Sequence, residues 1–433
     1  MADLQKSIYS TKKNHLNKNG CFPNRAYIVF LVLAAAFISL SYAHEIIKMA
    51  VFSNFGDFGS YYFYSKALSL NYNVYDLDEG TIEQLSEKFR VPPFPHPTGH
   101  SPIFLFLARS FTFFEYRLAS IIWLLLLNIL LFFITSIILR VAYEKIVDID
   151  RKFIMTSSVF LVLSFHPLIE NMHLGQINLL ALFFVVLCLY FLNKKKYVIS
   201  GVMLSLSILM KPFLGILLLF FLWKRCYRVF FSALISFIVL EALGIFLNGV
   251  DIYFKYLTVM KNYILTDNIS VANLSLENLF SRVANLSTHP NFININASLA
   301  FTLSIILLLY LLYITKGRFN GLDLKFILEF LLFITFAFIV SPVVHEHHYV
   351  FLYLPILFLW ARLSKDARLV PALLFIISFL LIGLRYSLVR FPIFNMGPLA
   401  IFSGCKLYGV IILFFLTAYM IVTEKSVKDK NRE

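Results

Sequence analysis

Charged residues are scarce in this chain, and their scarcity excludes a soluble globular protein. Only 14% of the 433 residues are charged, whereas 60% are hydrophobic, and the mean hydropathy is +0.79. A soluble domain carries about 25% charged residues. The composition therefore indicates a protein that crosses the membrane several times.

Cysteines and glycine-rich motifs are also sparse. The four cysteines have no metal-like spacing, and two lie in or beside apolar runs, so no disulfide framework is predicted. No glycine-rich phosphate loop follows a strand, and no polar segment is large enough for a soluble nucleotide-binding domain. We therefore expect neither a cofactor nor a metal. Because no internal repeat divides the chain, we treat residues 1–433 as a single membrane domain.

The net charge of +14 does not indicate a nucleic-acid partner. The cations occur in short clusters between apolar runs, the pattern by which membrane proteins anchor their cytoplasmic loops. Basic residues also precede the first apolar run, 27–43, and no small-residue cleavage site follows it. We therefore expect a retained first helix with a cytoplasmic N-terminus.

Apolar runs predict about twelve membrane segments, with both termini in the cytoplasm. A spanning helix needs about 20 apolar residues, and fewer where it is short or ends in a wet cavity. The candidate runs are 27–47, 118–139, 153–168, 179–192, 197–222, 229–247, 298–314, 326–342, 349–360, 370–384 and 404–422. Run 197–222 counts twice, because Lys211–Pro212 lies in its middle and proline breaks the helix there.

The basic clusters set the orientation, because lysine and arginine in short loops lie on the cytoplasmic side. The clusters are the N-terminal tail, 140–152, 194–196, 224–228, 316–325, 362–368 and the tail from Lys425. All become cytoplasmic if 197–222 is a hairpin of two half-helices and if 102–114, with Arg109 in its middle, lies on the outer face. Two large outer loops follow, 48–117 and 248–297. The first is longer than a connector requires, which suggests a function.

With this topology, the unusual polar residues collect on the outer side. Asp57 follows the first apolar run, where the chain emerges from the membrane. The others are His173, Gln176 and Asn178 in HLGQINLL, Lys211 at the hairpin tip, His345, Glu346, His347 and His348 in SPVVHEHHYV, and Arg385 and Arg390. Ionisable groups at membrane depth are costly and usually face a cavity, a partner or a pathway.

Simpler explanations exist for each of these residues. Asp57 could be a solvated helix cap, and Lys211 could extend its ammonium group to the membrane surface. Gln176 could satisfy backbone groups where the chain turns. Histidines with a glutamate suit zinc, but consecutive helical residues point about 100° apart, so His347 and His348 would not easily share one ion.

Four separated blocks of the sequence carry a resemblance to a known family. The blocks are DFGSYYFYSKAL (57–68) with NVYD (73–76), ENMHLGQINLL (170–180), SGVMLSLSILMKPF (200–213) and SPVVHEHHYV (341–350). In this order they resemble glycosyltransferase family 87, membrane mannosyltransferases of the GT-C superfamily that use polyprenyl-phosphate-linked sugars. The segment 101–114 departs from the family, because it begins Ser-Pro where Tyr-Pro-Pro is expected.

The resemblance implies an all-α GT-C fold, with membrane-surface helices in the first outer loop, and a role for each matching residue. It makes Asp57 the catalytic base and places Lys211, His347 and His348 at the donor phosphate. The full set of predicted substrate-binding residues is Tyr61, Tyr62, His173, Gln176, Asn178, Lys211, His347, His348 and Arg385.

The residues themselves fit sugar transfer from a lipid phosphate, because phosphate is a good leaving group and needs no strong general acid. One carboxylate fits a single inverting displacement in which Asp57 takes the acceptor's proton. Lys211, an imidazolium and an arginine would stabilise the departing phosphate. We therefore predict a plasma-membrane hexosyltransferase. It would move a hexose, mannose by the resemblance, from a polyprenyl-phosphate sugar to a lipid or glycolipid hydroxyl on the extracytoplasmic face.

Two other functions fit part of this pattern. A transporter or flippase of lipid-linked sugars also places charged residues around a helix break, although it would show a repeat between its halves. A surface-polysaccharide polymerase or ligase acts on lipid-linked sugars as well. Its catalytic arginines would lie in a large late loop, and Asp57 would have no special role.

Overall fold

Helices make up the regular structure of the chain, as the all-α prediction requires. The computed structural model describes residues 25–52, 55–92, 99–146, 149–266, 270–284, 293–365, 368–383, 385 and 391–430. Within these ranges every regular element is an α-helix or a 3₁₀-helix. The prediction of an all-helical protein is therefore confirmed.

Five helical stretches are long and apolar enough to cross a membrane. They are Leu33–Phe52 of α2 (Arg25–Phe52), α6 (Tyr116–Lys145), α12 (Tyr227–Asn248), Ala297–Ile314 of α15 (Ile293–Ile314), and Pro398–Glu424, which joins η8 (Pro398–Gly404) to α19 (Cys405–Lys430). The pair α7 (Arg151–Leu163) and α8 (His166–Leu174), bent by 53°, gives a sixth if it is one span. The chain is thus a multi-pass membrane protein. Within the described residues five or six helical stretches have spanning length, and the predicted twelve segments stay a prediction.

The other predicted segments are shorter helices. They are α9 (Asn178–Asn193), α10 (Tyr197–Met210), α11 (Ile216–Trp223), α16 (Leu324–Val340), α17 (Tyr353–Leu363) and α18 (Leu369–Gly383). An α-helix rises 1.5 Å per residue, so the 14 residues of α10 are about 21 Å long, less than the ~30 Å hydrocarbon core. The centre of the bundle is α16, which is buried from Phe326 to Ile339.

Run 197–222 folds back on itself, as the break at Lys211–Pro212 predicts. Between α10 and α11 the chain makes the 3₁₀-helix η2 (Pro212–Gly215). After α11 it returns to the start of α10, where the Arg228 guanidinium lies 6.0 Å from the centre of the Tyr197 ring. A Cβ on Gly201 would lie 2.6 Å from the carbonyl oxygen of Val229, so glycine permits this close packing of α10 on α12.

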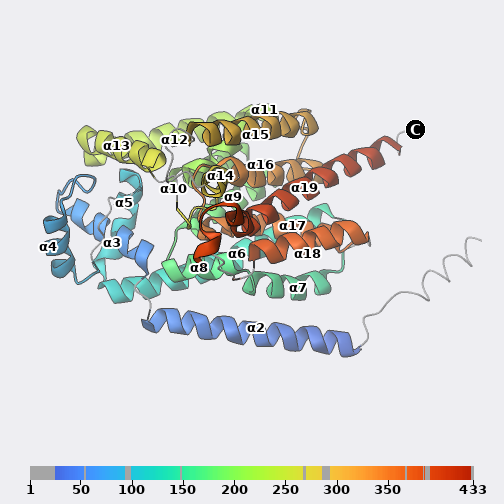
Figure 1. The fold of residues 1–433 in the computed structure, drawn as a ribbon, viewed down its shortest axis with the longest axis horizontal. Helices are drawn as coiled ribbons and strands as arrows, with labels where there is room; N and C mark the ends of the chain where they lie inside the picture. The colour runs from blue at the N-terminus through green and yellow to red at the C-terminus, as the bar shows by residue number, and fades with distance from the viewer. Residues whose placement is uncertain are drawn as a thin grey trace, which may run out of the picture.

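The first loop forms a cap of short helices at one end of the bundle. These are α3 (Gly56–Ser69), α4 (Glu79–Phe89), α5 (Pro102–Ala108) and the 3₁₀-helix η1 (Arg109–Phe113). Together with α13 (Val250–Thr266) they form one end of the molecule, and the start of α2 and the end of α19 lie at the other end (Figure 1). The seven residues of α5 are too few to cross a membrane, as predicted for 102–114, and Arg109 is exposed.

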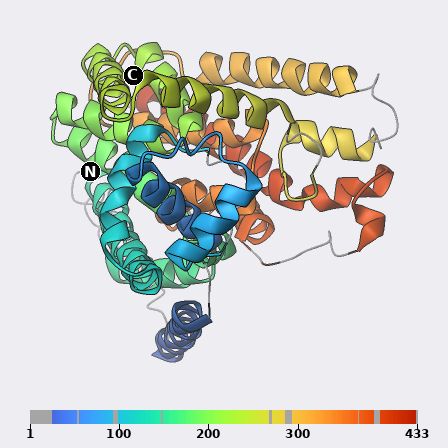
Figure 2. The ribbon, with the colours of Figure 1, turned by 90° about the vertical axis from the view of Figure 1, so that its left-hand side faces the viewer.

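The first helix stands at the edge of the molecule. Seen from the end that carries the cap, α2 lies apart from the other helices (Figure 2). It packs mainly on α7 and only weakly on α6. Apolar side chains such as Phe37 and Leu40 remain exposed on it, as expected for a helix that faces lipid.

Candidate functional site

Gln176 lies at the centre of the predicted site. Its side chain is buried, and its Oε1 accepts hydrogen bonds from the Tyr61 hydroxyl at 3.0 Å and from Lys211 Nζ at 3.3 Å. The Gln176 side chain also hydrogen-bonds Asp57. Because Oε1 already has two donors, the amide nitrogen is the group that serves the Asp57 carboxylate. One amide thus joins a carboxylate from the cap to a lysine from the hairpin.

Gly175 allows this meeting of α3 with the turn between α8 and α9. It has a left-handed backbone (φ +68°), and a Cβ there would lie only 2.8 Å from the Cβ of Phe58. Its carbonyl oxygen accepts a hydrogen bond of 2.7 Å from Trp123 Nε1. The glycine therefore brings the backbone before Gln176 against the first turn of α3, where Asp57 lies.

The start of α3 has an unusual backbone. Phe55 caps this helix with φ 44° and ψ 65°, a left-handed conformation that a bulky side chain rarely adopts. Its carbonyl oxygen accepts the Gly59 N–H at 2.7 Å, and its ring is fully buried. Such strain persists only where the surroundings enforce it, and it often occurs at functional sites. It fixes the direction in which α3 begins, two residues before Asp57.

Asp57 is half-buried, and its environment favours its protonated form. Burial raises the pKa of the Asp57 carboxyl above its usual value, although the nearby Lys211 charge and the Gln176 hydrogen bond act to lower it. His345 lowers this pKa as well, whereas Glu170 of α8 raises it. A carboxylate with a raised pKa is a stronger base than one free in water.

Three histidine rings pack together beside this cluster, in and just before the 3₁₀-helix η5 (Glu346–Leu352). The His347 and His348 rings meet edge to face with centres 4.5 Å apart, and His345 lies within 5.6 Å of both. Asn178 Nδ2 donates a 2.9 Å hydrogen bond to the carbonyl oxygen of His347. Within the described residues, no three His, Cys, Asp or Glu side chains are grouped so as to hold a metal ion.

The surroundings of His347 and His348 favour the neutral form of both rings, so an imidazolium at the phosphate stays a prediction. Burial lowers the pKa of both rings well below the usual value. The Lys211 charge lowers the pKa of both rings further, and the adjacent His347 ring lowers that of His348 as well. Lys211 is thus the residue of this cluster that carries a full positive charge most readily, and each neutral histidine can still donate one N–H hydrogen bond.

The histidine turn is tied down by residues whose partnership the sequence does not reveal. Glu346 Oε1 lies 2.5 Å from His166 Nδ1 of α8 and 2.9 Å from Lys406 Nζ of α19. Lys406 is 3% exposed and Glu346 is half-buried, so this ion pair is partly shielded from solvent. Asn273 holds the other side of the turn, since its Nδ2 donates to the Pro342 carbonyl and its Oδ1 accepts from the Val344 N–H.

His100 is a further member of the site that the sequence did not indicate. Its ring lies edge-on to Tyr61, with centres 4.7 Å apart. Burial, with a smaller effect of the Lys211 charge, lowers the pKa of His100 to about 3. Nothing in the sequence marks His100 for this role, because a histidine next to Ser101–Pro102 in the first loop has no distinctive spacing.

Three of the predicted residues lie differently from the rest. The Tyr62 hydroxyl donates to the carbonyl oxygen of Phe114 at 2.8 Å, within the cap, so its predicted contact with substrate stays a prediction. His173 is exposed in the last turn of α8, and Arg385 is exposed beyond the end of α18. Arg390 lies outside the described residues.

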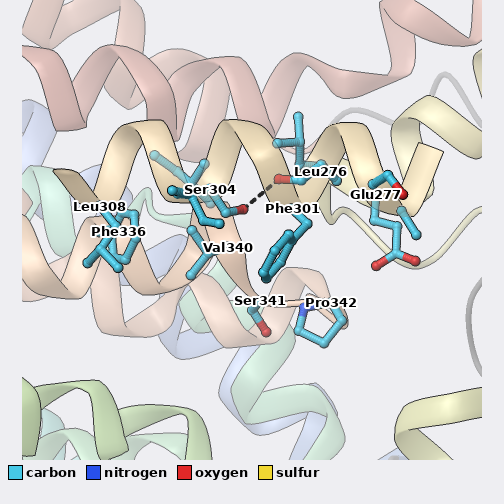
Figure 3. A pocket seen from close by; sticks show the side chains of 14 residues that line it. Leu276, Glu277, Phe301, Ser304, Leu308, Phe336, Val340, Ser341 and Pro342 are labelled. Carbon is cyan, nitrogen blue, oxygen red and sulfur yellow. Dashed lines mark hydrogen bonds between the residues drawn. The ribbon is translucent and has the colours of Figure 1, made fainter. Parts of the chain in front are cut away.

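A lateral groove lies close to the histidine turn. It has a volume of about 630 Å³ and lies between α14 (Leu276–Val283), α15 and α16. Most of its lining is apolar, and Phe301, which is 66% exposed, points from α15 toward Ser341 and Pro342 (Figure 3). Because Asn273 binds the Pro342 carbonyl, the groove ends at the turn that carries the histidines.

A comparison with protein families agrees with this arrangement. No curated protein matches the chain. The sequence model of glycosyltransferase family 87 matches residues 99–342, more than half of the chain. The matched stretch contains Gln176, Asn178 and Lys211, whereas Asp57 and the histidine turn lie outside it. An all-helical membrane protein that matches this family over most of its bundle is a hexosyltransferase, and the chain belongs to glycosyltransferase family 87.

Proposed function

We propose that this membrane glycosyltransferase moves a hexose, mannose by the family resemblance, from a polyprenyl-phosphate sugar to a hydroxyl of a lipid or lipid-linked glycan. The observation that carries the proposal is the shared amide of Gln176, which holds Asp57 and Lys211 side by side. A base and a phosphate-binding cation are the two groups that such a transfer requires.

Asp57 acts as the base in a single inverting displacement. The acceptor oxygen forms its bond to the anomeric carbon as its proton passes to the Asp57 carboxylate. The bond from that carbon to the phosphate oxygen breaks, and polyprenyl phosphate leaves with the electron pair. Tyr61 and Gln176 keep the carboxylate in position, because Gln176 bonds both it and the tyrosine.

Lys211 stabilises the negative charge of the departing phosphate. It ends α10 at partial membrane depth and is half-buried, so fewer waters compete with its interaction with the phosphate. His347 and His348 donate neutral N–H hydrogen bonds to the same oxygens. Asn178 supports them, because it holds the His347 backbone.

The groove between α15 and α16 receives the chain of the lipid-linked donor. A volume of about 630 Å³ lies within the range of ligand pockets, and its wall is largely apolar. It ends at Pro342, three residues before His345. A prenyl chain in this groove would bring its phosphate to the histidine turn without a soluble donor-binding domain.

The site faces the outside of the plasma membrane in this proposal, and the chain acts as one membrane domain. The basic loops would be cytoplasmic, with the cap of α3, α4 and α5 on the extracytoplasmic surface. In this proposal a helix too short to cross the bilayer is still a membrane segment, because it ends at a polar cavity within the protein and not at the far membrane surface. The twelve segments would be α2, α6, α7, α9, α10, α11, α12, α15, α16, α17, α18 and α19.

Incubation of the purified protein with radiolabelled polyprenyl-phosphate sugars and a membrane lipid extract tests this function. We expect label from one hexose donor, mannose first, to enter an extractable glycolipid. Nucleotide sugars serve as the matched donors and should give no labelled product. Labelling from a nucleotide sugar alone would overturn the proposed donor.

A further inference from the structure

A second groove lies outside the site described above, because its lining includes neither Gln176 nor any residue of the histidine turn. It has a volume of about 810 Å³, and residues of α2, α6 and α7 line it. Its walls are mostly apolar, and two of the lining residues, Phe132 and Met155, are 68% and 59% exposed. Because α2 packs on α7 but barely on α6, the space between α2 and α6 stays open to the surroundings.

The length of this groove matches one leaflet of a bilayer. Its inner end is closed where the Tyr42 hydroxyl donates to Asn128 Oδ1 at 2.8 Å. From Asn128, at this closure, to Arg140 the groove follows twelve residues of α6, about 18 Å of helix. Half of the hydrocarbon core is about 15 Å thick. The groove is therefore long enough for one acyl chain of a single leaflet.

The mouth of the groove is cationic. Arg140 and Arg151 line it, and Lys152 is exposed beside them. Two carboxylates lie there as well. Glu144 pairs with Arg140 at 3.5 Å and with Lys194 at 3.6 Å, and Asp150 caps the start of α7. The cations Arg140, Arg151, Lys152 and Lys194 outnumber these two carboxylates, so the mouth keeps a net positive charge.

We propose that this groove binds an anionic phospholipid of the cytoplasmic leaflet, with its phosphate at Arg140 and Arg151 and an acyl chain running toward Asn128. The orientation rests on the topology proposed above, but the binding does not depend on the transferase reaction. The cytoplasmic leaflet supplies anionic lipids, and each nearby arginine strengthens their binding. The lipid would fill the space between α2 and α6 and so attach the first helix to the bundle.

Thermal unfolding of the purified protein in detergent tests this proposal, with native mass spectrometry to count bound lipids. Phosphatidylglycerol should raise Tm more than phosphatidylcholine with the same acyl chains, because a ligand that binds only the folded state stabilises it. The double variant Arg140→Gln/Arg151→Gln should lose this difference and bind phosphatidylglycerol about thirtyfold more weakly. Its folding should persist, since the Arg140 pair with Glu144 is exposed.

Two control variants make the test specific. Lys316→Gln removes one cation that lies 5.0 Å from the centre of the Tyr313 ring on α15, away from the groove, and should keep the full phosphatidylglycerol effect. Met155→Trp should block the groove and reduce binding of both lipids. Equal shifts of Tm by the two lipids, or an unchanged effect in the double arginine variant, would overturn the proposal. So would binding of polyprenyl phosphate, but not of phosphatidylglycerol, at these arginines.

Discussion

The Lys211 ammonium lies 3.3 Å from Oε1 of Gln176 and donates a hydrogen bond to it. The same side chain hydrogen-bonds the Asp57 carboxylate. A cation from the hairpin tip and a carboxylate from the cap are therefore held by one amide, although 154 residues separate them in the sequence. Substitutions of these three residues should therefore change the rate or pH dependence of transfer. Substitutions of the residues packed around them should change the stability of the fold.

Asp57→Asn should lower kcat by about 10²–10⁴-fold, because it removes the group that accepts the acceptor's proton. The amide occupies the same volume, so expression and binding of the lipid phosphosugar should persist. Radiolabelled transfer and donor binding are measured on the same preparation. The control is Glu83→Gln on α4 of the same loop, because its side chain is exposed and lies in none of the four blocks that resemble the family. Near-normal transfer by Asp57→Asn would remove Asp57 from the mechanism.

Gln176→Leu should shift the pH dependence of the reaction as well as slow it. Burial raises the pKa of Asp57, and the hydrogen bond from Gln176 partly offsets that rise. Without this bond the Asp57 pKa should rise further, and the carboxylate needed as base should be lost at a higher pH. The acidic limb of the kcat/KM profile should therefore move to higher pH. A slower enzyme with an unmoved profile would show that Gln176 has only a structural role.

Lys211→Gln should weaken both donor binding and kcat, because the ammonium is proposed to contact the phosphate in both states. Loss of one preorganised donor to a developing charge typically lowers kcat by about 10²–10³-fold. The control is Lys255→Gln on α13, which removes an exposed lysine of the cap. Binding of polyprenyl phosphate and the rate of transfer are both measured. Unchanged phosphate binding in Lys211→Gln would contradict its role.

The sequence predicted the main features of the fold because hydropathy and charge act locally. The apolar runs, the break at Lys211–Pro212 and the separate first loop all follow from such patterns. Helix lengths did not follow, because α10 ends after 14 residues at Lys211, which bonds Gln176 of the polar cluster. Hydropathy alone therefore gives twelve segments where only five or six helices of the described chain have spanning length.

The site was predictable only where a residue was unusual in its own surroundings. Asp57 and Lys211 are charges beside apolar runs, so each was recognisable alone. His100 and Lys406 gained their partners through packing between distant elements, which no local pattern encodes. The lowered pKa values of His347 and His348 depend on burial and on the Lys211 charge, and sequence alone contains neither.

Gly175→Ala should destabilise the protein by about 1–3 kcal/mol, because the new Cβ would overlap Phe58 and the backbone there is left-handed. The matched control is Gly215→Ala, at the end of η2 in the hairpin tip. Gly215 has an ordinary helical backbone, and no atom lies within 4 Å of the position that a Cβ would take there. Thermal unfolding should show a lower Tm for the first variant only. Equal Tm values would mean that the turn before Gln176 can move away from α3.

Ser304→Phe should separate lipid-linked donors by the length of their chains. Ser304 lines the groove between α15 and α16, so a phenyl ring there should occupy the space proposed for the prenyl chain. KM should rise for a long-chain donor and stay unchanged for a short-chain analogue that does not reach the groove, with a similar kcat for both. Leu309→Phe is the control, because Leu309 lies on the same helix, is 61% exposed and does not line the groove. An equal rise of KM for both donors would indicate a general disturbance of α15. An unchanged KM for both would mean that the prenyl chain binds outside this groove.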